Sequence, residues 1–425
     1  MTSGSGVERV SRVTTRQNGL AFETFGNPAI PHRTDTDAGT LRIVSSWPAN
    51  ERASQNQTEA AVFVHRDFSV AIQLALDLAG SAAGGFRCVY EALDNGTAAY
   101  PTVWDATNEI ANANTAVDDA ATVAFIGGIH TGAVQQSIPI LSRAVPSLAV
   151  VVPAATWPGL TRQISGITEF GEPGRYAPTG VRNVVRFGPT DDGTGSAAAQ
   201  WVFEAGGRRT ASVFHDNGRY GRCVAISFAS AFAALGGTVT QTTALPADPL
   251  NFDGHVASVM GSGSDCVFIG GVATPKLSQL IEELRSQVGA DGLTIIGGDG
   301  LMAEGQSGVF VPELPGGLIA VGPVLPAELP GDGAIWTAVM RYRIGQDRDP
   351  HPSAVHAFEA AVAIIQAIDA VGSDDRVTIL AAIQATHEFI GLSGTVLINL
   401  TGDRELVPYR IAQVEGGRFV TIGRR

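Results

Sequence analysis

The sequence predicts an α/β protein of two lobes, each a doubly wound parallel sheet, joined by a three-strand hinge. The 425 residues are too many for one ordinary core and favour two domains. Short β-branched runs alternate with longer amphipathic stretches, and this alternation occurs in two separate series. A less periodic stretch rich in Gly, Pro and Arg, residues 157–194, separates the two series and indicates a crossing between lobes.

The elements of the first lobe follow an aperiodic start. Residues 1–39 show little periodicity and are expected to form an extended lead-in segment. From Leu41 onwards the pattern predicts, in order, strand 41–46, helix 60–79, strand 86–93, helix 103–112, strand 123–126, a helix after Gly132 and strand 147–152. Strands that alternate with helices form a parallel sheet that is covered on both faces.

The second series repeats this pattern and then returns to the first lobe. Its strands are expected at 210–214, 238–245, 266–270 and 294–297, and its helices at 221–234, 252–260 and 275–288. The run 318–324 should cross back, helices 354–371 and 376–385 should join the first lobe, and strands 394–400 and 406–414 should cross once more.

The predicted domains follow from these crossings. They are a lead-in of residues 1–39, an N-terminal lobe of 40–187 plus 322–391, and a C-terminal lobe of 188–321 plus 392–425. Open parallel sheets bind ligands beyond the carboxyl ends of their strands. The cleft between the lobes is therefore the expected binding site.

The composition excludes several classes of function. With 41 Asp and Glu against 28 Lys and Arg, the net charge of -13 disfavours nucleic acid as a partner. Cys88, Cys223 and Cys266 show no metal-ligand spacing, and no disulfide between Cys223 and Cys266 is expected. Lys276 is the only lysine and lies in no phosphate-binding loop, so neither a metal nor a cofactor is predicted.

Two turns at strand ends consist mainly of small and hydroxyl residues. They are residues 127–132, with the sequence Gly-Gly-Ile-His-Thr-Gly, and residues 153–156, with the sequence Pro-Ala-Ala-Thr. A strand followed by such a turn and then a helix leaves backbone N–H groups open at the helix start, where an anion is favoured. The turns therefore indicate a site for a small carboxylate; ordinary turn and N-cap chemistry is the alternative.

No catalytic group accompanies these turns. His215 and Asp216 are adjacent, so their side chains point in different directions at a strand end, and no nucleophile follows them. The sequence therefore predicts a binding protein and not an enzyme.

Six motifs occur in order over most of the chain. They are the Gly-Gly-x-x-Thr-Gly turn, the run 152–161, residues 185–189 with Asp191, His215-Asp216 with Tyr220-Gly221, residues 296–300, and Gly391-x-x-Gly394 with Gly402-Asp403. With these motifs the chain, from about Leu41 to Val420, resembles the type I periplasmic binding proteins, specifically the branched-chain amino-acid (Leu/Ile/Val) substrate-binding proteins of ABC importers.

The resemblance implies roles for particular residues. The ligand's carboxylate would bind at the first-lobe turns through Thr131, Ala154 and Thr156, with Gly132 and Ala155 beside them. Asp299 would take the ammonium group, and Tyr220 would close over the ligand. The chain departs from the family pattern in having Thr131 where Ser is usual, and in lacking the aromatic residue that usually follows the Gly270-Gly271 pair.

Other interpretations of the same residues stay open. Asp299 could be a turn former between two glycines, and Tyr220 could pack at the rim of the cleft. His130 could tune affinity with pH or be an exposed turn residue. Trp47 and Trp157 could form walls of the pocket or be buried packing.

The expected function is that of an extracytoplasmic solute-binding protein that traps an amino acid, branched-chain or otherwise apolar, or a related small carboxylate by hinge closure. The expected partners are this ligand and a membrane permease, and the protein is expected to be a periplasmic or extracellular monomer, free or lipid-anchored. A native signal peptide is expected to be missing from this sequence. Alternatives are a ligand-sensing domain of a receptor or regulator, or a binding protein for an amide, urea or aromatic acid.

Overall fold

The computed structural model describes residues 38–48, 60–97, 104–128, 130–246, 251–288, 292–302, 315–329, 332–345, 348–385 and 389–425. The predicted lead-in of residues 1–39 lies outside these residues apart from Ala38 and Gly39. The chain divides into two compact units. Unit 1 comprises Met1–Gln163, Thr168–Gly188 and Leu325–Val407, and unit 2 comprises Ile164–Ile167, Pro189–Val324 and Pro408–Arg425.

The main sheet of unit 1 has six strands in the order β2-β3-β1-β4-β5-β6. They are β1 (Thr40–Trp47), β2 (Ala82–Ala83), β3 (Phe86–Asp94), β4 (Thr122–Ile126), β5 (Ala149–Val152) and β6 (Val184–Arg186). All neighbours pair in parallel except the short β2, which runs antiparallel to β3. Every residue of β4 and β5 is buried, as expected for strands covered on both faces.

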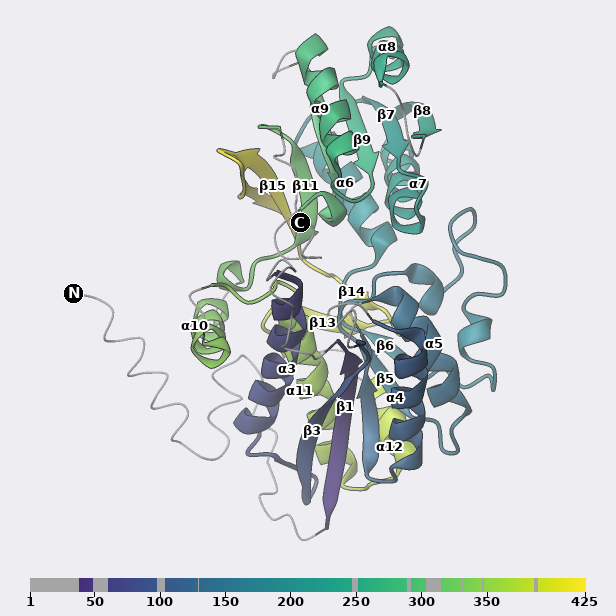
Figure 1. Cartoon of the computed structure of the whole chain (residues 1–425), viewed down its shortest axis with the longest axis vertical. Helices are drawn as coiled ribbons and strands as arrows, with labels where there is room; N and C mark the ends of the chain where they lie inside the picture. The colour runs from purple at the N-terminus through teal and green to yellow at the C-terminus, as the bar shows by residue number, and fades with distance from the viewer. Residues whose placement is uncertain are drawn as a thin grey trace, which may run out of the picture. The chain divides into compact units, whose positions relative to one another are not determined.

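Helices cover both faces of this sheet (Figure 1). The helices of unit 1 are α3 (Ala60–Leu78), α4 (Ala106–Asp118), α5 (Thr131–Arg143), α10 (Gly333–Ile344), α11 (Ala354–Val371) and α12 (Arg376–Gln384), with the 3-10 turns η1 (Pro158–Leu160), η2 (Gly174–Tyr176) and η4 (Pro326–Glu328). α11 packs against α3 and α12, and α4 packs against α5. The carboxylates of Asp105 and Asp375 accept the first N–H groups of α4 and α12, which fixes where these helices begin.

The helix α11 is the apolar centre of unit 1. Among the described residues it is the one helix long and apolar enough to cross a bilayer, and 78% of that stretch is buried inside the structure. Its burial is that of a core helix.

The sheet of unit 2 is mixed. Its order is β16-β15-β11-β10-β9-β7-β8, with β7 (Thr210–His215), β8 (Thr238–Ala244), β9 (Cys266–Gly270), β10 (Thr294–Gly298), β11 (Ile319–Pro323), β15 (Tyr409–Glu415) and β16 (Arg418–Arg424). The four predicted strands, β7 to β10, are parallel, β11 joins them in parallel, and β15 and β16 add an antiparallel edge.

The helices of unit 2 pack on this sheet in pairs. They are α6 (Asp191–Glu204), α7 (Arg219–Ala234), α8 (Asp253–Ser262) and α9 (Pro275–Val288), with the 3-10 turn η3 (Asp299–Leu301). α6 packs against α7, and α8 packs against α9. Between α7 and β9 the ring of Phe228 stacks on Phe268 with centroids 4.3 Å apart. Unit 2 therefore has a core of its own.

The predicted domains differ from the two units in several places, and residues 164–167, predicted in the N-terminal lobe, fall in unit 2. Residues 392–407, assigned above to the C-terminal lobe, lie in unit 1, where β12 (Phe389–Gly391), β13 (Gly394–Ile398) and β14 (Arg404–Glu405) form a small antiparallel sheet. The other boundaries fall at 188/189 and 324/325, where 187/188 and 321/322 were predicted.

Buried charges explain why this small sheet stays in unit 1. Glu359, on α11, accepts hydrogen bonds from the N–H and hydroxyl of Ser393 and pairs with Arg404 at 3.0 Å. Asp403 accepts the hydroxyl of Thr161 at 2.8 Å and pairs with Arg186 at 3.1 Å. These groups are nearly inaccessible to solvent, so separating them would leave charges buried without partners.

Candidate functional site

Two of the predicted turns lie side by side at the carboxyl edge of the unit 1 sheet. β4 and β5 are neighbouring parallel strands, so the turns after Ile126 and Val152 leave the sheet at the same edge. In the first turn Ile129 lies outside the described residues. α5 begins at Thr131, and its N-cap, His130, makes no side-chain capping bond. The helix start therefore lacks a capping side chain, and because the N–H of Ala133 bonds to the carbonyl of His130, the N–H groups of Thr131 and Gly132 are those that can face an anion.

The second turn is held close to the end of β6. Ala155 is fully buried, whereas Ala154 and Thr156 are half-buried. A Cβ atom at Gly188 would collide with the carbonyl oxygen of Pro153, so the two backbones touch at this point. The structure thus brings both predicted turns together on one rigid edge of unit 1.

A tryptophan that the sequence analysis did not select adjoins the first turn. A Cβ atom at Gly132 would lie 2.5 Å from Cζ2 of Trp104, so the indole ring packs directly on this glycine. Trp104 is half-buried and immediately precedes Asp105, the N-cap of α4. The only sequence signal was its place just before a capping residue, which says nothing about a neighbour 28 positions later in the chain.

The two tryptophans that were selected are buried in unit 1. Trp47, at the end of β1, donates to the hydroxyl of Ser69 at 3.1 Å and is 1% exposed. Trp157, also 1% exposed, donates to both carboxylate oxygens of Glu172 at 3.0 and 3.1 Å. These contacts favour the packing alternative, and a role of either ring as a pocket wall stays a prediction.

Uncharged histidines gather behind the first turn. The rings of His65 and His130 lie 6.2 Å apart, and Phe68 joins this group to His351. Burial and the neighbouring histidines lower the pKa of His65 to about 3, and burial lowers the pKa of His130. Burial, followed by the charge of Arg348, lowers the pKa of His351 to about 4. These imidazoles are therefore neutral at neutral pH.

In unit 2 the structure brings Tyr220 and Asp299 together. The hydroxyl of Tyr220, on α7, donates to Oδ1 of Asp299 at 2.6 Å and accepts the N–H of Gly300 at 2.8 Å. A Cβ atom at Gly298 or Gly300 would lie 2.5 Å from the tyrosine, so both glycines make room for this ring. Burial, and then Asp299, raises the pKa of Tyr220 well above its usual value, so the phenol keeps its proton and donates.

Other charged groups lie near Asp299. Burial, and then Asp192, Asp299 and Asp191, raises the pKa of Tyr409 above its usual range. Asp191 and Asp192 open α6, next to the carboxyl edge of the unit 2 sheet. The buried guanidinium of Arg410 lies at the same edge, where it donates to the sulfur of Met302 at 3.7 Å, so a positive charge accompanies these carboxylates.

His215 and Asp216 organise a turn. Nδ1 of His215 accepts the N–H of Asn217 at 3.1 Å. The carboxylate of Asp216 accepts the N–H of Gly218 at 2.8 Å and that of Val272 at 3.4 Å, which links the ends of β7 and β9. Val272, at the position where the resemblance leads one to expect an aromatic residue, is half exposed.

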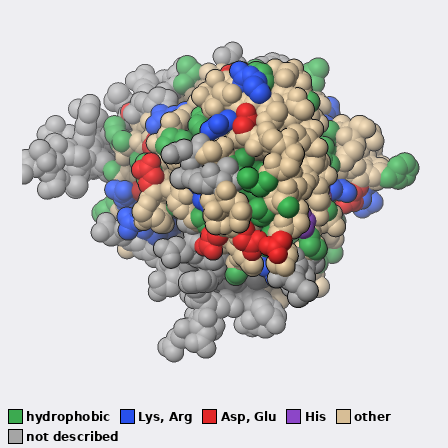
Figure 2. Space-filling view, turned by 90° about the horizontal axis from the view of Figure 1, so that it is seen from above, with side chains coloured by type: hydrophobic (Ala, Val, Ile, Leu, Met, Phe, Trp, Pro, Cys, Tyr) green, Lys and Arg blue, Asp and Glu red, His purple; other side chains and the backbone are tan. Residues whose placement is uncertain are grey.

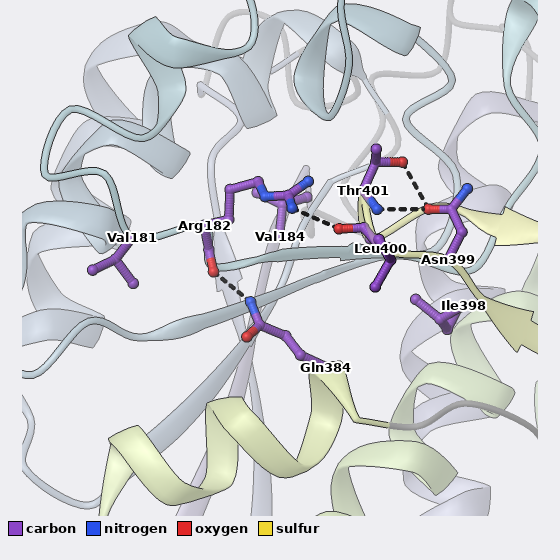
Figure 3. A pocket seen from close by; sticks show the side chains of 9 residues that line it. Val181, Arg182, Val184, Gln384, Ile398, Asn399, Leu400 and Thr401 are labelled. Carbon is purple, nitrogen blue, oxygen red and sulfur yellow. Dashed lines mark hydrogen bonds between the residues drawn. The ribbon is translucent and has the colours of Figure 1, made fainter.

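A cavity of about 350 Å³ opens elsewhere in unit 1 (Figure 3). It is lined by the approach to β6, the end of α12 and the turn after β13. Arg182 donates to the carbonyl of Leu400, and Gln384 donates to the carbonyl of Arg182. Because these bonds join the lining residues to one another and none of the predicted site residues lines it, this cavity is separate from the two turns.

The face drawn in Figure 2 carries side chains of both charges. On the face drawn in Figure 2, basic side chains are dispersed among acidic and apolar ones over the described residues. In the part of the chain that the structure describes, no group of three His, Cys, Asp or Glu residues could hold a metal ion, and Cys88, Cys223 and Cys266 are buried free thiols.

Known proteins resemble this chain in sequence and in fold. The family model described as periplasmic binding protein matches residues 57–418. The Leu/Ile/Val-binding protein homolog 1 of Brucella suis is 25% identical over 245 residues, 57% of this chain and 63% of the relative, so the match spans less than two thirds of that protein.

Solved structures share the fold. A leucine binding protein from Thermotoga maritima superposes with a TM-score of 0.64 at 21% identity, covering 90% of this chain and 98% of the other. A solute binding protein of an ABC transporter from R. palustris, solved in complex with benzoate, gives a TM-score of 0.62 at 16% identity and covers 91% and 96%.

The family match covers most of the chain, and the likeness to solved structures agrees with the two α/β units. The family is that of periplasmic binding proteins. The chain therefore belongs to the periplasmic binding protein family, in the type I group that includes the branched-chain amino-acid binding proteins.

Proposed function

We propose that this protein is the solute-binding component of an ABC importer and that it captures an amino acid or a related small carboxylate. The observation that carries the proposal is the opposite polarity of the two strand edges. Unit 1 carries the hydroxyl residues Thr131 and Thr156 at its two turns and a helix start without a capping side chain, and unit 2 carries the carboxylate of Asp299 with Asp191 and Asp192 nearby. A zwitterion needs both kinds of group.

In this proposal the two units divide the recognition of the ligand. The α-carboxylate accepts hydrogen bonds at Thr131, Gly132, Ala154, Ala155 and Thr156. The ammonium group bonds to Asp299, whose carboxylate Tyr220 orients through the 2.6 Å hydrogen bond. The ligand favours the closed conformation because only that conformation allows it to contact both units.

The remaining parts of the proposal concern partners and location. The closed, loaded form is presented to a membrane permease, and the protein acts as a monomer in the periplasm. The similarity to the Leu/Ile/Val-binding homolog of Brucella suis and to the leucine binding protein of Thermotoga maritima supports an aliphatic amino acid as the first ligand to test.

An aromatic acid is a second candidate ligand because of Trp104. The indole that packs on Gly132 offers a flat apolar surface beside the amides that would hold a carboxylate. The similarity to the benzoate-bound protein of R. palustris supports the same ligand class.

Titration calorimetry on the full chain tests these assignments. Leucine, its des-amino analogue 4-methylpentanoate, and benzoate would be titrated in turn. Tight binding of leucine alone supports the zwitterion site, and binding of benzoate without any amino acid supports the second candidate.

The variant Asp299→Asn tests the role of the carboxylate directly. Its amide oxygen can still accept the Tyr220 hydroxyl, so the local geometry is preserved while the charge is removed. Leucine should lose about 2–5 kcal/mol of binding free energy, because its ammonium group is then buried without a counter-charge, and 4-methylpentanoate should lose little. Asp253→Asn, an exposed position on α8, is the matched control. Equal losses for both ligands would remove Asp299 from the ammonium role.

A further inference from the structure

A pair of imidazoles adjoins the first turn of the candidate site. The ring centroids of His65 and His130 lie 6.2 Å apart, and the ring planes are tilted by 60°. His130 is the N-cap of α5, is half-buried and makes no side-chain capping bond. His65, on α3, is 5% exposed. The pair therefore places one accessible ring and one buried ring beside the amides that open α5.

The buried ring has an unsatisfied polar atom. Nδ1 of His65 has no hydrogen-bond partner among the residues that the structure describes. Nδ1 of His351, by contrast, accepts the N–H of Ser353 at 3.2 Å. Native proteins match nearly all buried polar atoms with a protein group, a water molecule or a ligand, because an unmatched one is costly. The described residues therefore leave this nitrogen open to a polar group of a ligand or to a water molecule.

The absence of charge on the pair restricts what that group can be. Burial and neighbouring histidines lower the pKa of His65, and burial lowers that of His130, so both rings are neutral at neutral pH. Arg348, whose charge acts on His351, is already bound by the carboxylate of Asp67 through two contacts of 2.7 Å. A charged ligand side chain would lose its hydration here without gaining a counter-charge, whereas a neutral polar group loses much less.

We propose that the ligand's side chain carries a hydroxyl or carboxamide group that hydrogen-bonds to the His65–His130 pair. A neutral imidazole can donate through one nitrogen and accept through the other, so it matches either group. The inference rests on the proposed function, because it takes the ligand's α-carboxylate to lie at the start of α5. It differs from the aliphatic side chains of leucine, isoleucine and valine, for which the relatives are named.

Threonine and valine form a matched pair of ligands for the test. They are nearly isosteric and differ by a hydroxyl in place of a methyl group. Calorimetric titration of the full chain at neutral pH should show threonine binding roughly 5- to 150-fold more tightly than valine, the range that corresponds to one buried polar group left unpaired. Asparagine should likewise bind more tightly than leucine.

Substitutions locate the effect. His65→Leu and His130→Leu should each move the threonine-to-valine affinity ratio towards one. His65→Asn should keep it, because the side-chain amide nitrogen of asparagine lies close to the place of Nδ1. His255→Leu, on α8 of unit 2, makes the same chemical change far along the chain and should leave the ratio unaltered. A merely structural role of His65 would change the thermal midpoint without changing this ratio.

The outcomes separate this inference from the function on which it rests. If the wild-type protein binds valine as tightly as threonine, a water molecule satisfies His65; the inference is then wrong and the amino-acid site stands. If neither these four amino acids nor any other binds at millimolar concentration, the proposed function and the inference both fail.

Discussion

Mild acid should destabilise unit 1, because two buried histidines resist protonation in the folded state. Burial, and then His130 and His351, lowers the pKa of His65 to about 3. Burial, and then Arg348 and His356, lowers the pKa of His351 to about 4. Because an unfolded histidine titrates at about 6.5, the unfolded chain binds more protons than the folded chain below this pH. The stabilisation is complete above about pH 6.5 and is lost as the pH falls towards the folded values.

The size of the loss follows from proton linkage. Between about pH 7 and about pH 5 each of the two histidines should reduce the free energy of unfolding by about 2 kcal/mol, because the unfolded ring becomes protonated while the folded ring stays neutral. The two together give about 4 kcal/mol, which is a large part of the roughly 5–15 kcal/mol by which domains are stable.

Urea denaturation followed by tryptophan fluorescence measures this loss. Four of the five tryptophans lie in unit 1, so the signal reports mainly on that unit. In His65→Leu the loss between the two pH values should fall to about half, and in the control His255→Leu it should be unchanged. A wild-type loss below about 1 kcal/mol, or a His65→Leu variant with the full loss, would refute the burial of neutral imidazoles as its cause.

Two further substitutions test the packing around the site. Gly132→Ala should displace the ring of Trp104, shift the tryptophan emission and weaken ligand binding, and it should cost about 1–3 kcal/mol of stability. The control Gly174→Ala, whose added methyl group meets open space, should have none of these effects. Unchanged emission in Gly132→Ala would contradict the contact between Gly132 and Trp104. Asp403→Asn should destabilise unit 1 by about 3–5 kcal/mol in thermal or urea denaturation, because it removes the charge that its buried arginine partner needs. Asp349→Asn, which breaks an exposed ion pair, should cost less than about 1 kcal/mol, and equal losses in both variants would sink this reasoning.

Periodicity was sufficient to predict two doubly wound sheets, because it reports which faces of a strand or helix are covered. The continuous apolar run of β5 could only be a strand buried on both faces. Periodicity was not sufficient to assign β13 to a unit, because its sequence pattern is that of any strand that could cross between units. Hydrogen bonds of Arg404 and Ser393 to Glu359 keep it in unit 1, and these two residues lie 45 and 34 positions after Glu359 in the chain.

The same contrast holds at the candidate site. That the turns after β4 and β5 share an edge follows from parallel pairing, and the structure agrees. Which tryptophan lies beside them could not be predicted, because a loop's course is set by contacts that have no local pattern. Trp157 donates a hydrogen bond to Glu172, 15 residues later, whereas Trp104 packs on Gly132 of the first turn.

The chemistry of the unit 1 edge also bears on how such a protein would hold an anion. The candidate groups there are backbone amides, hydroxyls and imidazoles whose pKa values are lowered, so the edge as described by these groups offers donors without a full positive charge. Hydrogen bonds from neutral donors to a carboxylate are weak in water and strong where water is excluded. Strong binding at this edge therefore requires that something cover the bound carboxylate. In the proposed function Asp299 binds the cationic group of the ligand, so tight binding is coupled to recognition of both ends of the ligand.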